Sequence, residues 1–472
     1  MPELTDTARV LVVRNPATGE SVGELVLNTV QDVDRVVEAA SVAQQVWSRE
    51  PRHVRSALLL KGAREIHAHR EELAVLLTSE NGKPLDQARA EVDTTVRLYR
   101  SFAERMLAWH EDARFLDAQV GLEHDVEITH HEPLGVVVTI VPFNFPSELQ
   151  AWKVAPALAA GNSVIVKPSS SAPLTVTREI ELLVGAGLPE GVLQVVQGDS
   201  RIGSALAAHP RVAAVSLTGS TEAGINVATA GAKTLKRVFL ELGGNDALIV
   251  FADSDLDRVV REAVFGRSLA NGQVCAANKR ILVQRAVGDE VVGRLIERFG
   301  SLRVGDPMQP ETEIGPLINR SAADRVVQEV RHSIAQGARL TCGDAVTDGA
   351  FVRPVVLVDE KGTADVSRDL EIFGPVLDVI PFDTQEDAIR IANQSVYGLS
   401  GAVFSGDFSR AFRVALSLHA GHVTVNGTGL YRSDECAWGG VKLSGNSREG
   451  LSTGLEEYMQ VKTLTLRNVA TM

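Results

Sequence analysis

The chain has 472 residues, of which 44% are hydrophobic and 23% are charged, and its formal net charge is −13 at pH 7. A chain of this length exceeds what one hydrophobic core usually supports, so we expect two or more domains. The negative charge disfavours nucleic acid or an anionic membrane surface as the main partner.

Three features of the sequence indicate where in the cell the protein is located. The segment MPELTDTARVLVV has an acidic start and only a short apolar run, unlike a secretory signal. No apolar stretch approaches the roughly 20 residues of a membrane span. Three cysteines make no disulfide framework in so long a chain, which is typical of a reducing compartment. We therefore expect a cytoplasmic protein without a membrane partner.

Helix-start signals and apolar runs alternate along the chain. Capping residues precede a helical period at Thr29 and Asp32, at Ser254 and Asp257, and at Ser321 and Asp324. Gly337 is the expected end of the last of these helices. Short apolar runs between helices indicate strands that are buried on both faces. These runs are residues 136–141, 163–166, 192–196, 212–217, 247–251 and 281–283.

This alternation predicts parallel sheets in a doubly wound α/β architecture. In such folds, ligands bind beyond the carboxyl ends of the strands. We therefore expect the chemically informative residues at those ends.

Two residues beside turn-forming glycines are candidates for chemistry. Cys275 follows the turn dipeptide Asn271-Gly272, where a thiol can be exposed to substrate and close to N–H groups that favour thiolate. Glu241 ends the run 238–240 and precedes two glycines, which can deliver a carboxylate into a cleft. Each alone has a plainer interpretation, a packing cysteine and a solvated strand-end glutamate.

An asparagine between two prolines follows the predicted strand at 136–141. In Pro142-Phe143-Asn144-Phe145-Pro146 the prolines restrict the backbone around the amide side chain. An amide held at the end of a strand can donate its NH₂ to an oxyanion. A loop that proline merely stiffens is the alternative.

Three further segments could hold a dinucleotide. Lys167 ends a predicted strand and suits a ribose hydroxyl or a phosphate. Gly219 and Gly224 frame a helix start whose N–H groups and dipole can hold a pyrophosphate, although their spacing differs from the usual dinucleotide fingerprint. Glu371 and Phe373 can share one face of an extended segment, with the acid on a sugar diol and the ring on a flat base. A strand edge before a turn is the alternative for this last pair.

Together and in this order, these segments resemble the aldehyde dehydrogenase superfamily, in its hydrolytic type, which does not acylate CoA. The resemblance covers about residues 10–466, and the spacing of 34 residues from Glu241 to Cys275 is also that of the family. The matching segments are residues 142–146, 167–169, 218–224, 241–244, 272–275, 371–375 and 439–445, with lesser matches at 15–19, 81–84 and 393–400.

The resemblance implies three parts. They are a Rossmann-like NAD(P)-binding domain of residues 1–111 and 133–240, a catalytic α/β domain of residues 241–446, and a small β oligomerisation arm with a C-terminal strand, residues 112–132 and 447–472. The arm alternates apolar and polar residues, as a two-faced hairpin does. The alternating positions are Val120, Leu122, Val126, Ile128 and His130. The family's arm joins subunits, so we expect a homodimer or homotetramer.

The resemblance also implies the reaction. The Cys275 thiolate attacks the aldehyde carbon, and the Asn144 amide and the Cys275 backbone N–H hold the oxyanion. Hydride transfer to nicotinamide leaves a thioester, which water activated by Glu241 hydrolyses, and no metal takes part. Cofactor contacts are carried over to Ile140, Pro142, Phe143, Lys167, Ser169, Ser170, Gly219, Ser220, Gly224, Leu242, Glu371 and Phe373. Substrate contacts are carried over to Phe145, Glu148, Trp152, Val274, Arg432 and Trp438.

The loop at 428–437 is expected to line the aldehyde tunnel. Relatives that act on fatty or aromatic aldehydes have an apolar side chain at the position of Arg432, whereas arginine can pair with an anionic group at the far end of a substrate. A surface pair of Arg432 with Asp434 or Glu435 is the alternative. Val274 disfavours a phosphorylated aldehyde, and an ionised Glu148 would disfavour anions. The sequence favours a small polar aldehyde or a semialdehyde, as in succinate-semialdehyde and lactaldehyde dehydrogenases.

Three other functions compete with this interpretation. A CoA-acylating dehydrogenase generally lacks the general-base glutamate that Glu241 supplies here. A non-catalytic protein on the same fold would not need Cys275, Glu241 and Asn144 together. An acyl-thioester hydrolase would need no cofactor.

We predict that NADP⁺ is accepted, and preference for it stays open. NAD-preferring relatives often carry a glutamate at the position of Ser170, where its charge repels a 2′-phosphate. Ser170 has no such charge, and Lys167 is nearby. A comparison of kcat/KM for NAD⁺ and NADP⁺ checks this, and a strong preference for NAD⁺ would refute it.

Overall fold

Two sheets organise the protein, which we describe from a computed structural model that places residues 10–469. One sheet has five parallel strands in the order β7-β6-β5-β8-β9. Its strands are β5 (Val136–Ile140), β6 (Ser163–Lys167), β7 (Leu193–Val195), β8 (Val212–Thr218) and β9 (Arg237–Glu241). Their apolar, largely β-branched residues are buried on both faces, as the sequence predicts.

Helices cover both faces of this sheet. Val137, Val164 and Val166 pack in one cluster with the helices of one face, and Val136, Val138 and Ile165 pack with those of the other. The first face carries α2 (Arg52–Ala68), α4 (Leu85–Leu107), α5 (Pro146–Ala160) and α6 (Leu174–Gly185). The second carries α1 (Val30–Trp47), α7 (Ser200–Ala208) and α8 (Thr221–Ala232), and α3 (Arg70–Asn81) packs against α4 and α6.

The second sheet has seven strands in the order β12-β15-β16-β11-β10-β17-β18. They are β10 (Asp246–Val250), β11 (Asn278–Gln284), β12 (Arg339–Cys342), β15 (Val355–Val358), β16 (Val376–Phe382), β17 (Ser400–Phe404) and β18 (His422–Val425). The helices of this half are α9 (Leu256–Ser268), α10 (Gly288–Gly300), α11 (Arg320–Ala335), α12 (Gln385–Asn393) and α13 (Phe408–Ser417). Helices α9 and α10 pack on one face, and α12 and α13 pack on the other. The predicted doubly wound α/β class is therefore correct for both halves.

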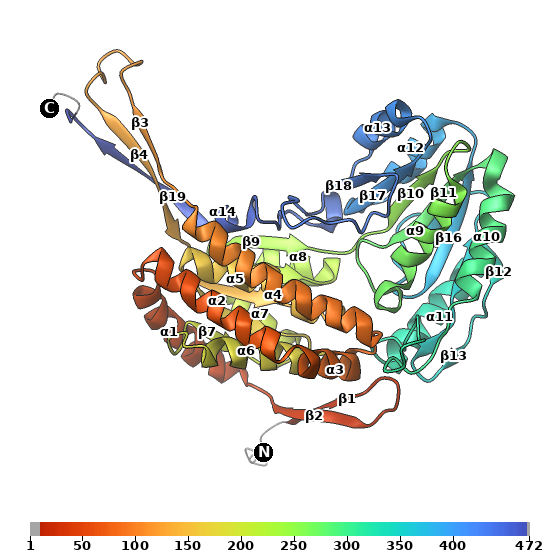
Figure 1. Cartoon of the computed structure of the whole chain (residues 1–472), viewed down its shortest axis with the longest axis horizontal. Helices are drawn as coiled ribbons and strands as arrows, with labels where there is room; N and C mark the ends of the chain where they lie inside the picture. The colour runs from red at the N-terminus through yellow and green to blue at the C-terminus, as the bar shows by residue number, and fades with distance from the viewer. Residues whose placement is uncertain (1–9, 470–472) are drawn as a thin grey trace.

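Three small sheets complete the molecule. They are β1 (Val10–Arg14) with β2 (Ser21–Val26), β13 (Thr347–Asp348) with β14 (Phe351–Val352), and β3 (Asp112–Phe115), β4 (Val126–Pro133) and β19 (Met459–Leu466) in the order β19-β4-β3. A short helix, α14 (Gly454–Glu457), precedes β19. The last of these sheets projects from the body as an arm (Figure 1). Within residues 10–469, no helix is both long and apolar enough to cross a membrane.

The structure corrects some local predictions. Asp255, not Ser254, caps α9 because its side chain accepts from the Arg258 N–H, and Asn319, not Ser321, caps α11. In the arm, Val120 and Leu122 lie in the turns between β3 and β4, where Val120 is 95% exposed, so the predicted strand alternation there is wrong. The capping box at Thr29 and the positive φ at Gly337 are as predicted.

Candidate active site

The five-stranded sheet brings the predicted cofactor residues to one edge. Ile140 is in register with Lys167 on β6 and with Leu217 on β8, and Thr218 is in register with Glu241 on β9. Because parallel strands end at the same edge, the segments that follow them meet there. These segments contain Pro142, Phe143, Ser169, Ser170, Gly219 and Ser220.

The residues at this edge suit a dinucleotide. Ser220 caps α8 by accepting from the Ala223 N–H at 3.2 Å, and the α8 N-terminus is a site that favours phosphate. A Cβ at Gly224 would lie 2.6 Å from a Leu242 methyl group, so a larger residue there would require the Leu242 side chain to move. Lys167 is buried at this edge. Burial lowers the pKa of its amine, and the negative charge of Asp199 partly offsets this decrease. The Ser170 hydroxyl donates to the Gly198 carbonyl at 3.0 Å and brings no charge.

The segment at 371–375 reaches the same region from the other half of the molecule. Phe373 packs edge-on against Phe143, with 5.9 Å between the ring centroids. Glu371 accepts from the Gly244 N–H at 3.2 Å and lies 3.3 Å from the Lys279 Nζ. The two halves of the predicted cofactor site are therefore in contact.

The loop before Cys275 has an unusual backbone. Ala270, Asn271 and Gly272 all have positive φ values, of 47°, 59° and 77°. The Asn271 side chain accepts from the Gly315 N–H at 2.7 Å and donates to the Pro316 carbonyl at 2.7 Å. A Cβ on Gly272 would lie 2.3 Å from the Gly374 carbonyl, which requires glycine there.

Arg267, a fully buried residue of α9, joins this loop to the cofactor segment. Its guanidinium donates to the carbonyls of Gly272 at 3.1 Å and Val376 at 2.6 Å, and also to that of Ile372. One side chain thus fixes the thiol loop relative to residues 371–375.

Asn144 lies beside the thiol loop. Its buried amide donates to the Gln273 carbonyl at 2.9 Å, two residues before Cys275, and an NH₂ group has a second hydrogen to donate. The Lys83 amine donates to the Asn144 carbonyl at 2.6 Å and pairs with buried Glu91. The structure therefore brings Asn144 to the loop that carries Cys275.

Burial determines the properties of Cys275. It raises the pKa of the thiol to about 12; the Lys279 charge opposes this rise, while Glu371, Asp246 and Glu241 add to it. Surroundings that favour thiolate, which the sequence predicted for this turn, are therefore not found. Glu241 reaches the same region, because a Cβ on Gly439 would lie 2.9 Å from its Oε1, and the preceding residue, Trp438, belongs to a cluster against which Cys275 packs.

Glu241 is buried among other charged groups. Its carboxylate accepts from the Ser447 hydroxyl at 2.7 Å. Burial and the Glu449 carboxylate raise the pKa of Glu241 well above its ordinary value, against the effects of Lys153 and Arg432. Burial also acts on Glu449, but the charges of Lys153 and Arg432 outweigh it and lower the pKa of Glu449.

Sequence reasoning missed Lys153 and Glu449. The Lys153 Nζ lies 2.5 Å from the Glu449 Oε1, and both side chains are almost completely buried. A lysine inside the otherwise apolar stretch 151–160 of α5 was the available signal for Lys153. Glu449 follows the motif at 439–445 but carries no local signal of its own.

Three of the six predicted substrate residues lie in two adjoining clusters. Trp438 belongs to a cluster against which Cys275 packs, and Val274 belongs to a cluster against which Phe145 packs; Leu430 touches both clusters. Trp152 donates from its indole to Glu148 at 3.2 Å.

Arg432 does not form the surface pair with Asp434 or Glu435 that the sequence left as an alternative. Asp434 pairs with Arg97 at 2.7 Å and Glu435 pairs with Arg105 at 3.1 Å, so that prediction is wrong. Arg432 instead lies over the Trp152 ring and beside Glu449.

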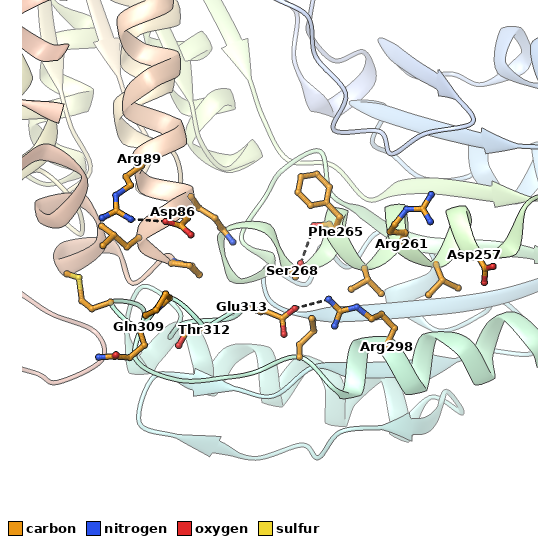
Figure 2. Close-up of a pocket in the computed structure, with 18 residues that line it drawn as sticks. Asp86, Arg89, Asp257, Arg261, Phe265, Ser268, Arg298, Gln309, Thr312 and Glu313 are labelled. Carbon is orange, nitrogen blue, oxygen red and sulfur yellow. Dashed lines mark hydrogen bonds and ion pairs between the residues drawn. The ribbon is translucent and has the colours of Figure 1, made fainter. Parts of the chain in front are cut away.

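A separate cavity of about 820 Å³ lies on another side of α9, between the start of α4, α10 and the segment at 308–313 (Figure 2). Its charged side chains include the pairs Arg89–Asp86 at 2.8 Å and Arg298–Glu313 at 2.7 Å. The residues that line it do not include any of the predicted site residues.

Comparisons with known proteins agree with this fold. A model of the aldehyde dehydrogenase family matches residues 4–464. A betaine aldehyde dehydrogenase of Cereibacter sphaeroides is 37% identical, over 97% of this chain and 94% of its own length. The crystal structure of an NADP-dependent enzyme of E. coli has 34% identity and a TM-score of 0.93, with 97% of this chain and 95% of that chain covered. A betaine aldehyde dehydrogenase of Staphylococcus aureus in complex with NAD⁺ has 33% identity and a TM-score of 0.93, with 98% and 92% covered.

The α/β fold and these relatives define an oxidoreductase that acts on aldehydes with NAD(P)⁺. The chain belongs to the aldehyde dehydrogenase family. The resemblance predicted from the ordered motifs is confirmed.

We expect the substitution Arg267→Met to lower the free energy of unfolding by about 3 kcal/mol or more, because buried carbonyl oxygens lose their donors. Thermal or urea unfolding measures this loss. Arg261→Met on the exposed side of the same helix is the matched control and should change little. Equal losses in the two variants would contradict a special role of Arg267.

Proposed function

We propose that the enzyme oxidises its aldehyde to a carboxylic acid through a thiohemiacetal and then a thioester on Cys275. The observation that carries this proposal is the position of the Asn144 amide, held by the carbonyl of Gln273 beside the thiol loop. From there its second N–H, together with the Cys275 backbone N–H, can stabilise an oxyanion.

The raised pKa values of Cys275 and Glu241 determine where the protons go during the reaction. A thiol with a pKa of about 12 keeps its proton at neutral pH, so its attack requires a base. Glu241 is a carboxylate in range of this thiol, and its raised pKa makes it a stronger base. As the C–S bond forms, the proton passes to Glu241 and the oxyanion develops at Asn144.

The second half of the reaction uses the same groups. Bound NAD(P)⁺ supplies the hydride acceptor, and Lys167, Ser220, Gly224, Glu371 and Phe373 are the residues that would hold it. Once the oxyanion has collapsed to a thioester, Glu241 releases to solvent the proton that it took from the thiol. Glu241 then takes a proton from water as the water oxygen bonds to the acyl carbon, and it returns this proton to the sulfur as the C–S bond breaks. Hydrolysis in this way, without CoA, is what a general-base glutamate supports.

The proposal extends to assembly, location and substrate. The arm of β3, β4 and β19 would join two or four copies in the cytoplasm, and the domains would divide at the boundaries given above. The relatives named for betaine aldehyde make that aldehyde one candidate substrate, whereas the sequence favours a small polar aldehyde or a semialdehyde.

With aldehyde and NAD(P)⁺, the variant Glu241→Gln should form an acyl adduct on Cys275 more slowly than the wild type, because the attack loses its base. The adduct that does form should persist after the wild type has cleared its own, because hydrolysis loses the same base. The turnover of this variant should fall by roughly a hundredfold or more for the same reason. Intact-protein and peptide mass spectrometry locate the adduct, and Cys342→Ser serves as the control that keeps turnover. An adduct on Cys342 or Cys436, or acid formation that requires CoA, would refute the mechanism.

The pH profile should depend on Lys153. Glu241 acts as a base only when deprotonated, so activity falls as the pH drops through its raised pKa. Lys153 lowers that pKa, so Lys153→Gln should move the acid limb of the kcat profile upward by about one pH unit, and Lys153→Arg should leave it near its original place. An unmoved limb in a folded Lys153→Gln variant would contradict this coupling.

A further inference from the structure

The guanidinium of Arg432 lies over the faces of two tryptophan rings, those of Trp152 and Trp438, which are both predicted substrate contacts. We call these three side chains the substrate wall. The Arg432 Cζ lies 3.8 Å from the centroid of the Trp152 ring and 5.3 Å from that of Trp438. Cations within about 6 Å of an indole face are attracted by its negative potential, which is how proteins bind quaternary ammonium groups. A tryptophan pair that could receive a cationic ligand is therefore already filled.

Several contacts keep Arg432 in this position. Its Nη2 lies 3.3 Å from the Glu449 Oε2, and its side chain is only 13% exposed. Glu449 and Trp438 exchange two backbone hydrogen bonds of 2.7 Å, so the ring and the carboxylate form one unit. The pairs of Asp434 with Arg97 and of Glu435 with Arg105 anchor the loop beyond it.

The same guanidinium has an unused donor. Its Nε is buried and has no hydrogen-bond partner among residues 10–469. A buried donor without a partner is costly unless a ligand or water satisfies it. An acceptor at the far end of an aldehyde would satisfy it, and a carboxylate would also pair with its charge.

Near Arg432, the cations outnumber the carboxylate that they share, whereas the Glu148 carboxylate opposes an anionic ligand. Lys153 and Arg432 both face Glu449, so two cations share one carboxylate there. Glu148, another carboxylate beside the substrate wall, lies against the indole nitrogen of Trp152.

We propose that Arg432 determines the substrate class of this enzyme: it excludes aldehydes with a quaternary ammonium group and selects aldehydes whose far end carries a carboxylate. This inference rests on the proposed function, since it concerns the far end of the same substrate site.

Two matched pairs of aldehydes test the proposal. (Trimethylammonio)acetaldehyde and 3,3-dimethylbutanal have the same shape and differ in charge, and 4-oxobutanoate and its methyl ester differ in their negative charge. In the wild type, kcat/KM should be at least about tenfold higher for the neutral member of the first pair and for the anion of the second. Equal use of the cation and its neutral isostere would overturn the proposal.

The variant Arg432→Leu should shift both ratios by about tenfold, toward the cation in the first pair and toward the ester in the second. Arg432 also affects the pKa of Glu241, so its substitution can change kcat/KM for every aldehyde. The ratio of kcat/KM between two aldehydes in the same variant is free of this effect, because both aldehydes meet the same Glu241. Arg178→Leu, which breaks an exposed pair with Glu72 away from this loop, is the matched control and should leave both ratios unchanged. Unchanged ratios in Arg432→Leu would overturn the proposal, and Arg432→Gln, which keeps a donor toward Glu449, repeats the test if the leucine variant does not fold.

A binding experiment separates this inference from the proposed function. The alcohols that correspond to the four aldehydes can be titrated into a Cys275→Ala variant, and their Kd ratios should follow the same pattern without turnover. If no aldehyde reduces NAD(P)⁺ or forms an adduct on Cys275, the proposed function fails, while the Kd ratios still decide the role of Arg432. Kd values that are equal within each pair would remove that role whatever the turnover.

Discussion

The burial of one carboxylate, that of Glu449, constrains the chemistry of the whole site. A buried carboxylate remains charged only if cations and hydrogen bonds replace its water, and here Lys153 from α5 and Arg432 from the tunnel loop both do so. Burial raises the pKa of the neighbouring Glu241, and the charge that Glu449 keeps raises it further. One ionic cluster therefore tunes the proposed base and also holds Arg432 on the tryptophan rings.

The thiol depends on a different kind of constraint, which lies in the backbone. Three consecutive left-handed residues, the close approach of Gly272 to Gly374, and the donors of Arg267 fix the chain before Cys275. None of these groups needs to touch a substrate. They hold the loop that carries Cys275 beside the Asn144 amide, and burial raises the pKa of the thiol, so its attack requires a base.

The sequence predicted the layered fold because each strand is a short apolar run buried on both faces, which a local pattern reveals. It placed the caps of α9 and α11 wrongly because Asp255 and Asn319, like the expected serines, can accept from an N–H two or three residues ahead. Cys275, Glu241 and Asn144 were found through the order of motifs, not through any single one. Lys153 and Glu449 were missed because they are 296 residues apart and meet only in the folded chain.

Similarity of fold does not extend to the substrate, because the recognition of a ligand lies in a few side chains placed on a shared framework. An NADP-dependent enzyme and a betaine aldehyde dehydrogenase match this structure equally, each with a TM-score of 0.93. The indole faces of Trp152 and Trp438 would attract a cation from any source. Since Arg432 supplies that cation and Glu449 holds it there, the rings no longer select a positively charged ligand. The two rings then support the guanidinium of Arg432, and the site prefers a negatively charged ligand.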